Sequence, residues 1–169
     1  MNPKIVTFGE VMMRLSPAGN RMLRQSNSME FFFGGTEMNV AASLSVLGLT
    51  AKHITAVVDD FVGEAAIASM QSFGIDTSDV LKNEHPLGTY LLEVGSGNRS
   101  SRIAYNRLNG SFANINYFKI NWEEILKDAA YFHWTGITPG ISENAYLSLK
   151  EALQVANSKG IQITTDPAY

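Results

Sequence analysis

Residues 34–39 read Gly-Gly-Thr-Glu-Met-Asn, and this stretch indicates the fold most directly. It joins an apolar run at residues 31–33 to a segment whose apolar residues recur at helical spacing up to Leu47-Gly48. Two glycines before a helix let a ligand approach the backbone and leave free N–H groups directed at it. The stretch is neither a P-loop nor a dinucleotide fingerprint, because the lysine and the third glycine are missing. A plain strand-to-helix turn explains it as well, so both interpretations stay open.

Outward from this turn, apolar strands alternate with helices. The helices are bounded by capping residues at their starts and by glycines at their ends. This alternation predicts an α/β fold in which parallel strands are joined by right-handed crossovers through helices. The expected strands cover residues 4–9, 51–58, 130–135 and 161–165, and the expected helices cover 36–47, 61–73 and 142–159, with a short helix capped by Asn121.

Two segments fit this alternation badly. Residues 11–33 contain short apolar runs around a polar loop, and residues 80–108 contain two alternating runs, 88–94 and 102–107, joined by a polar turn. Such runs are typical of antiparallel pairs with one polar face. We therefore expect a small β-sheet lid over a parallel sheet flanked by helices. The lid comprises residues 11–33 and 80–108, and the α/β core comprises residues 1–10, 34–79 and 109–169.

Composition excludes several classes of protein. The 169 residues carry a net charge of −3, whereas nucleic-acid binders usually show a basic excess. The absence of cysteine excludes disulfides, thiolate metal sites and cysteine nucleophiles. No apolar run approaches the ~18 residues that span a bilayer. We expect a cytoplasmic protein with no membrane or nucleic-acid partner.

A second set of candidate residues lies in the expected lid. Residues two apart on a strand face the same way, so Tyr105 and Arg107 share a face, and Tyr90 can join them from the partner strand. Two phenols and a guanidinium suit a small polyhydroxy anion, because arginine binds a carboxylate through two parallel hydrogen bonds. A solvated face with an arginine–aromatic contact is the equally simple alternative.

The remaining polar motifs have simple structural explanations. His133 lies in an apolar strand, where a histidine is more often part of the core than a catalyst. The pair Asp59-Asp60 could bind a cation, but capping of the next helix by one of the two explains it without a ligand. No metal-ligand spacing and no nucleophile elbow occurs. The sequence thus predicts no catalytic and no metal-binding residue in this chain.

The motifs together resemble those of the PfkB (ribokinase-like) carbohydrate kinases. The shared features are Gly-Gly-x-x-x-Asn at residues 34–39 before an alanine-rich helix, and Phe-Gly-Glu at residues 8–10. Tyr-x-Arg at residues 105–107 and Phe-His-x-Thr-Gly-Ile-Thr-Pro at residues 132–139 are most similar to 2-keto-3-deoxygluconate kinases. The resemblance covers essentially the whole chain.

The resemblance implies a Rossmann-like α/β domain, with a lid that often mediates homodimers. It implies transfer of the ATP γ-phosphoryl group to a sugar-acid hydroxyl, with Mg²⁺. The matching positions assign Gly34, Gly35 and Asn39 to the sugar pocket, Tyr90 and Tyr105 to the sugar chain, and Arg107 to the carboxylate.

Two departures from the family pattern limit what this chain can do. Family members commonly carry Asp-x-Asn-x-Arg after the strand expected at residues 161–165, whereas residues 166–169 here read Asp-Pro-Ala-Tyr. The family's Gly-x-Gly-Asp motif, which carries the catalytic base, does not occur in the chain. We therefore expect an amino-terminal half with the substrate pocket and lid, whose ATP and Mg²⁺ sites belong to the missing carboxyl-terminal half. Alone, it is expected to be inactive. The alternatives are a fructokinase-like enzyme for a neutral sugar and a non-catalytic sugar-binding protein.

Overall fold

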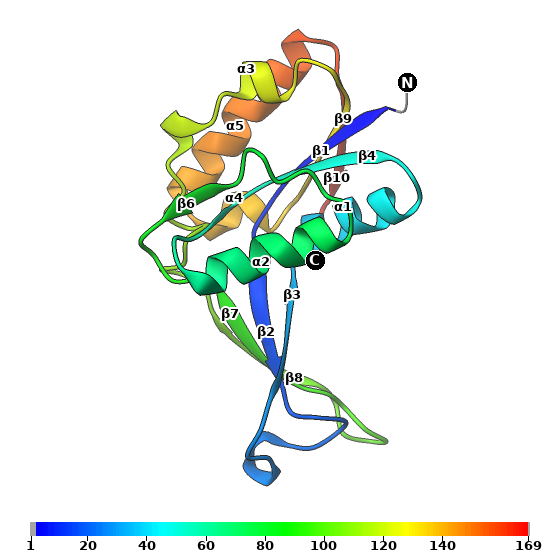
Figure 1. Cartoon of the computed structure of the whole chain (residues 1–169), viewed down its shortest axis with the longest axis vertical. Helices are drawn as coiled ribbons and strands as arrows, with labels where there is room; N and C mark the ends of the chain where they lie inside the picture. The colour runs from blue at the N-terminus through cyan, green and yellow to red at the C-terminus, as the bar shows by residue number, and fades with distance from the viewer. Residues whose placement is uncertain (1–2, 169) are drawn as a thin grey trace.

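The computed structural model describes residues 3–168, so Met1, Asn2 and Tyr169 lie outside the described residues. The chain forms an α/β layer from which a second β-sheet projects (Figure 1). None of the helices in residues 3–168 is both long and apolar enough to cross a membrane.

The first sheet has the strand order β10-β9-β1-β4, and all of its pairs are parallel. Its strands end at the same edge, because parallel strands share one direction. The strands expected near residues 4–9, 130–135 and 161–165 are confirmed. The bounds are β1 Lys4–Phe8, β4 Thr50–Ile54, β9 Ala129–Thr135 and β10 Gln162–Asp166.

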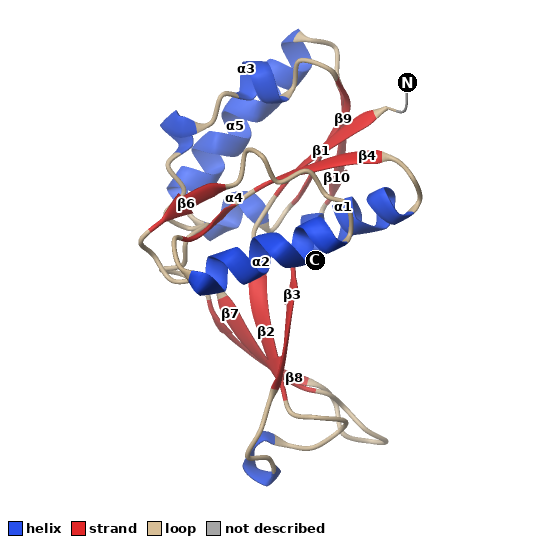
Figure 2. Cartoon of the chain, in the orientation of Figure 1, coloured by secondary structure: helices blue, strands red, loops and turns tan. Residues whose placement is uncertain are grey.

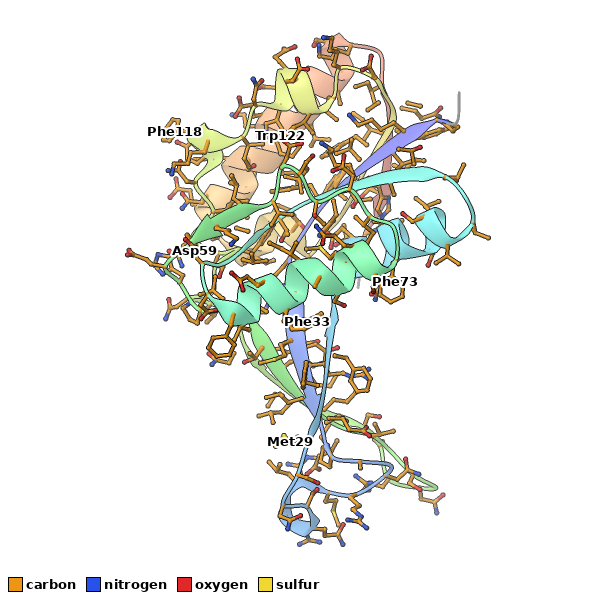
Figure 3. The ribbon with its side chains drawn as sticks, viewed as in Figure 1. Met29, Phe33, Asp59, Phe73, Phe118 and Trp122 are labelled. Atoms are coloured by element: carbon orange, nitrogen blue, oxygen red, sulfur yellow. The ribbon has the colours of Figure 1, made fainter. Side chains whose placement is uncertain are left out.

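Helices cover both faces of the first sheet (Figure 2). One apolar cluster packs α1 and α2 against β4, and the other packs α3 and α5 against β1 and β9. Trp122 of α3 (Figure 3) is buried in the second cluster. Its ring meets that of Phe8 edge-on, with the ring centroids 5.3 Å apart. The helix bounds are α1 Thr36–Val46, α2 Phe61–Ser72, α3 Trp122–Ile125, α4 Thr138–Ile141 and α5 Glu143–Ser158.

The expected helix caps are confirmed. The carboxylate of Asp60 accepts hydrogen bonds from the Val62 and Gly63 backbone N–H groups at 2.7 and 3.2 Å. The Ser142 hydroxyl accepts one from the Ala145 N–H at 3.1 Å. Gly160 follows α5 with φ +68°, a conformation that glycine adopts without steric cost. These local signals set the helix ends.

The second sheet has the order β3-β2-β7-β8 and projects from the carboxyl edge of the first sheet (Figure 1). The pairs β2–β3 and β7–β8 are antiparallel, and the central pair β2–β7 is parallel. The antiparallel pairing expected for residues 88–94 and 102–107 is therefore confirmed. The bounds are β2 Met12–Ser16, β3 Glu30–Gly34, β7 Thr89–Glu93 and β8 Arg102–Asn106.

The single strand expected over residues 51–58 is wrong, because the chain breaks it at Thr55. β4 ends at Ile54, and β5, Ala56–Val58, pairs with the short strand β6, Leu81–Asn83. The Thr55 carbonyl accepts a hydrogen bond from the Leu81 N–H at 3.0 Å, which starts this pairing. β6 lies within residues 80–108, but it belongs to this two-stranded sheet and not to the projecting one.

Candidate functional site

A cavity of about 280 Å³ lies where the carboxyl edge of the first sheet meets the second sheet. In α/β sheets this edge is the usual place for ligands. The N-terminus of α1 and the start of α4 form one side of the cavity, and β7 and β8 contribute to the other. Its lining includes all six residues selected from the sequence: Gly34, Gly35, Asn39, Tyr90, Tyr105 and Arg107.

Tyr90 and Tyr105 are direct partners in the β7–β8 pair, and their ring centroids lie 5.6 Å apart. The Arg107 guanidinium carbon lies 5.7 Å from the Tyr105 ring centroid. The shared face expected for the two phenols and the guanidinium is therefore present. Their binding of a ligand stays a prediction.

The two glycines play different parts. A Cβ at Gly34 would meet only the Asn39 side-chain oxygen, at 3.4 Å, so the Gly34 backbone borders the cavity without a tight neighbour. A Cβ at Gly35 would lie 1.9 Å from the Glu10 carbonyl oxygen. The close approach at Gly35 is thus made by the protein's own backbone, and a ligand is not needed to explain this glycine.

Glu37, in the first turn of α1, lines the cavity but was not among the residues selected from the sequence. Its side chain is buried, and one oxygen accepts hydrogen bonds from the Thr135 hydroxyl at 2.7 Å, the Thr135 N–H at 3.1 Å and the Thr138 hydroxyl at 2.6 Å. Three donors on one buried carboxylate fix the start of α1 against the end of β9 and the start of α4. Glu37 therefore shapes the cavity wall.

Glu10 is the second lining residue that sequence reasoning missed. It follows β1 by two residues, and its carboxylate lies 2.5 Å from an Arg107 guanidinium nitrogen. The Glu10 side chain is only 2% exposed and that of Arg107 is 18% exposed. Burial raises the pKa of Glu10, and nearby Glu37 adds to this, while the Arg107 charge and hydrogen bond lower it. The available signal was an acidic residue directly after a strand, at the edge where ligands bind.

The Arg107 Nε atom is buried and has no hydrogen-bond partner among the described residues. A guanidinium has five N–H donors, so the pair with Glu10 leaves donors unused. Arg107 is also the one cation that lines the cavity among residues 3–168. A ligand with a carboxylate would meet a positive group that the protein already holds in place.

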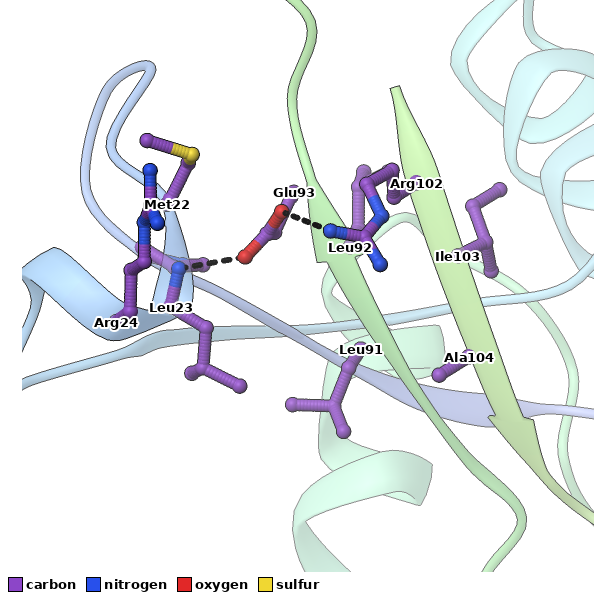
Figure 4. Close-up of a pocket in the computed structure, with 10 residues that line it drawn as sticks. Met22, Leu23, Arg24, Leu91, Leu92, Glu93, Arg102, Ile103 and Ala104 are labelled. Carbon is purple, nitrogen blue, oxygen red and sulfur yellow. Dashed lines mark hydrogen bonds and ion pairs between the residues drawn. The ribbon is translucent and has the colours of Figure 1, made fainter. Parts of the chain in front are cut away.

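The opposite face of the second sheet carries a different cavity, of about 670 Å³ (Figure 4). Leu91, Ala104 and Leu23 give it an apolar lining. The Glu93 carboxylate accepts a hydrogen bond from the Leu23 N–H at 2.7 Å and pairs with Arg102 at 3.9 Å. This larger cavity has few convergent polar groups, so the smaller one fits a polyhydroxy ligand better.

Residues 2–169 match the model of the pfkB family carbohydrate kinases. The chain belongs to this family. A 2-dehydro-3-deoxygalactonokinase from Haloferax volcanii is 30% identical over 169 residues, which make up 100% of this chain and 53% of that protein. The family membership confirms the resemblance inferred from the sequence motifs.

Solved structures of the family confirm the fold. The crystal structure of 2-dehydro-3-deoxygluconokinase from Thermotoga maritima matches with a TM-score of 0.97 and 37% identity, covering 99% of this chain and 51% of that one. An E. coli protein described as a ribokinase II, solved with ATP and Mg²⁺, matches with a TM-score of 0.86 and 20% identity, covering 98% and 53%. The chain thus spans about half the length of these pfkB relatives.

Proposed function

We propose that the protein is an ATP-dependent kinase for 2-keto-3-deoxygluconate or a similar sugar acid. In this proposal Arg107 binds the acid's carboxylate, and Tyr90 and Tyr105 contact the sugar chain. Gly34 and Asn39 face its hydroxyls from the other side of the cavity, while Gly35 allows Glu10 to pack beneath them. The relatives named above, a 2-dehydro-3-deoxygalactonokinase and a 2-dehydro-3-deoxygluconokinase, support this substrate class.

One observation carries the proposal. The cavity at the sheet edge brings a guanidinium with unused donors together with two phenols and an amide. The guanidinium is fixed by Glu10, so little side-chain freedom is lost when an anion binds. These groups match the carboxylate and hydroxyls of a small sugar acid.

We propose that the phosphate side of the reaction lies outside the residues described. No group of three or more acidic, histidine or cysteine side chains that could hold a metal occurs among residues 3–168. We derive no step of phosphoryl transfer from these residues. We propose that ATP and Mg²⁺ bind through the half of the family's length that this chain does not span, and that the 169-residue chain alone has no kinase activity.

A neutral sugar is the second candidate substrate. Arg107 is already paired with Glu10, so its charge is partly neutralised before any ligand arrives. A fructokinase-like enzyme would need no free cation in the cavity. A sugar-binding protein without catalysis is the third candidate.

Phosphorylation assays separate these candidates. The protein expressed from its complete gene should transfer phosphate from ATP to 2-keto-3-deoxygluconate with a much higher kcat/KM than to fructose. Preference for fructose would support the neutral-sugar enzyme. Binding of either sugar without turnover would support the non-catalytic protein. Kinase activity of the isolated 169-residue chain would contradict the proposal that ATP and Mg²⁺ bind outside it.

The lid is also proposed to form a homodimer through its apolar outer face. Leu91 and Leu23 on this face are 36% and 41% exposed, and a second copy would cover them. Light scattering should find a dimer that Leu91→Asp converts to a monomer. The matched control Val46→Asp, at an exposed apolar residue of α1, should leave the dimer intact. A monomeric unmodified protein would contradict this.

A further inference from the structure

Glu10 lies where several chain crossings between the two sheets converge. Its own segment joins β1 to β2, and Arg107 lies where β8 returns to the first sheet. A Cβ at Gly35, between β3 and α1, would lie 1.9 Å from the Glu10 carbonyl oxygen. A Cβ at Gly88, just before β7, would lie 2.4 Å from a Glu10 carboxylate oxygen. Four crossings therefore meet at Glu10, and two of them, at Gly88 and Arg107, reach its carboxylate.

The charges around this carboxylate do not balance. The charged groups that act on Glu10 are Arg107, which follows β8, and Glu37 of α1. The titratable phenols of Tyr90 and Tyr105, from β7 and β8, line the same cavity. The Glu10 carboxylate contacts the Arg107 guanidinium, and a second carboxylate, that of Glu37, disfavours the charged form of Glu10. An acid bound to Arg107 would add a third negative charge in a partly closed space.

Burial and a nearby like charge both disfavour the charged form of a carboxylate. The Glu37 carboxylate accepts three hydrogen bonds, all on one oxygen. Glu10 has an oxygen without a hydrogen-bond partner among the described residues. Burial also raises the pKa of Glu10 before any ligand binds. Glu10, which contacts the guanidinium that an acid would bind, is therefore the group that we expect to accept a proton.

We propose that Glu10 and the ligand carboxylate compete for the Arg107 guanidinium, so that binding of an acid transfers one proton from solvent to Glu10. This inference rests on the proposed function, because it requires an anionic ligand. It makes Glu10 a specificity-determining residue. An acid whose carboxylate pairs with Arg107 binds only when Glu10 is protonated, whereas a neutral sugar binds without changing the protonation of Glu10.

Titration calorimetry tests this with 2-keto-3-deoxygluconate and fructose as the probes. Heats measured in buffers of different ionisation enthalpy give the number of protons taken up. With the protein from the complete gene, uptake on binding the acid should rise towards one proton with increasing pH. The affinity for the acid should fall by up to about tenfold per pH unit in that range. Fructose should bind without uptake.

Glu10→Gln is the decisive variant, because glutamine has the shape of the protonated carboxyl group without the titration. It should bind the acid with no proton uptake and with a pH-independent affinity at least as high as that of the unmodified protein. The control Glu123→Gln, on α3, where the carboxylate pairs with Lys159 at 2.7 Å, should keep the full uptake. Infrared difference spectra of the unmodified protein give a second readout, since acid binding should produce a protonated-carboxyl band.

Three outcomes would overturn the inference in distinguishable ways. Acid binding without proton uptake and without the infrared band would contradict competition while leaving the proposed function intact. Uptake that persists in Glu10→Gln would assign the proton to another group. A protein that binds fructose and not the acid would overturn the proposed function together with this inference.

Discussion

The two sheets of this molecule are stabilised in different ways. In the first sheet, Val6, Phe8 and Ile54 are fully buried between helices. In the second sheet, every residue of β8 is exposed, and Ile103 remains 51% exposed. The first sheet gains its stability from apolar burial. The second depends on its hydrogen-bonded strands and on the polar contacts at its base, which are also the contacts that form the candidate site.

Matched phenylalanine substitutions should show the largest difference between the sheets. Phe132→Ala, at a fully buried position in β9, should lower the free energy of unfolding by about 3–5 kcal/mol. Phe31→Ala, at a 60% exposed position in β3, should cost less than about 1 kcal/mol. Urea unfolding of both variants measures this. Equal losses would show that the second sheet is packed as tightly as the first.

A buried histidine should make the stability of the first sheet depend on pH. His53 in β4 is fully buried and hydrogen-bonded to the Thr7 hydroxyl at 2.7 Å, and burial lowers its pKa to about 3. Above the ordinary histidine pKa of about 6.5, His53 is neutral in both the folded and the unfolded protein, so it does not lower the free energy of unfolding. As the pH falls from there towards 3, only the unfolded state takes up the proton. Stability should therefore fall by about 1.4 kcal/mol per pH unit.

Unfolding curves at several pH values, compared with those of His53→Gln, isolate this contribution. The variant should lose the slope that His53 contributes. If the slope is the same in both proteins, other groups cause it, and the histidine is not held neutral by the first sheet.

A methyl group at the base of the second sheet should disturb the site without affecting the first sheet. Gly88→Ala places a Cβ 2.4 Å from a Glu10 oxygen, so the Glu10–Arg107 pair must shift. We expect a loss of about 1–3 kcal/mol and weaker binding of the sugar acid. Gly140→Ala, where a Cβ meets nothing within 4 Å, is the matched control and should be close to neutral. Equal behaviour of the two variants would argue against a tightly packed junction.

Substitutions of two neighbouring aspartates should show the smallest difference in the free energy of unfolding. Asp60→Ala removes the cap of α2 and should cost about 1 kcal/mol. Asp59→Ala removes only an exposed pair with Lys82 at 3.2 Å and should cost less than about 0.5 kcal/mol. Thermal unfolding of the two variants measures the difference. A reversed order would mean that the surface pair matters more than the helix cap.

Local patterns made much of this fold predictable from the sequence. Caps such as Asp60 and Ser142, glycine stops such as Gly160, and strand alternation act within a few residues, so they can be read directly. The common face of Tyr90 and Tyr105 follows from one hairpin.

The missed features depend on contacts between distant residues. Glu10 meets Arg107, and Glu37 meets Thr135 and Thr138, only after the chain has folded. The three-residue strand β6 is defined by its pairing with β5 and has too little sequence of its own to signal it.

The central claim is that Arg107 gives the cavity its preference for an acid. The most direct test measures the dissociation constants of 2-keto-3-deoxygluconate and of fructose. It compares the unmodified protein with the double variant Glu10→Gln/Arg107→Gln, which removes both charges and so leaves neither one buried without its partner. Binding of the acid should weaken by about 1.5–3 kcal/mol, while binding of fructose stays the same. Unchanged binding of the acid, or an equal loss for both sugars, would contradict the claim.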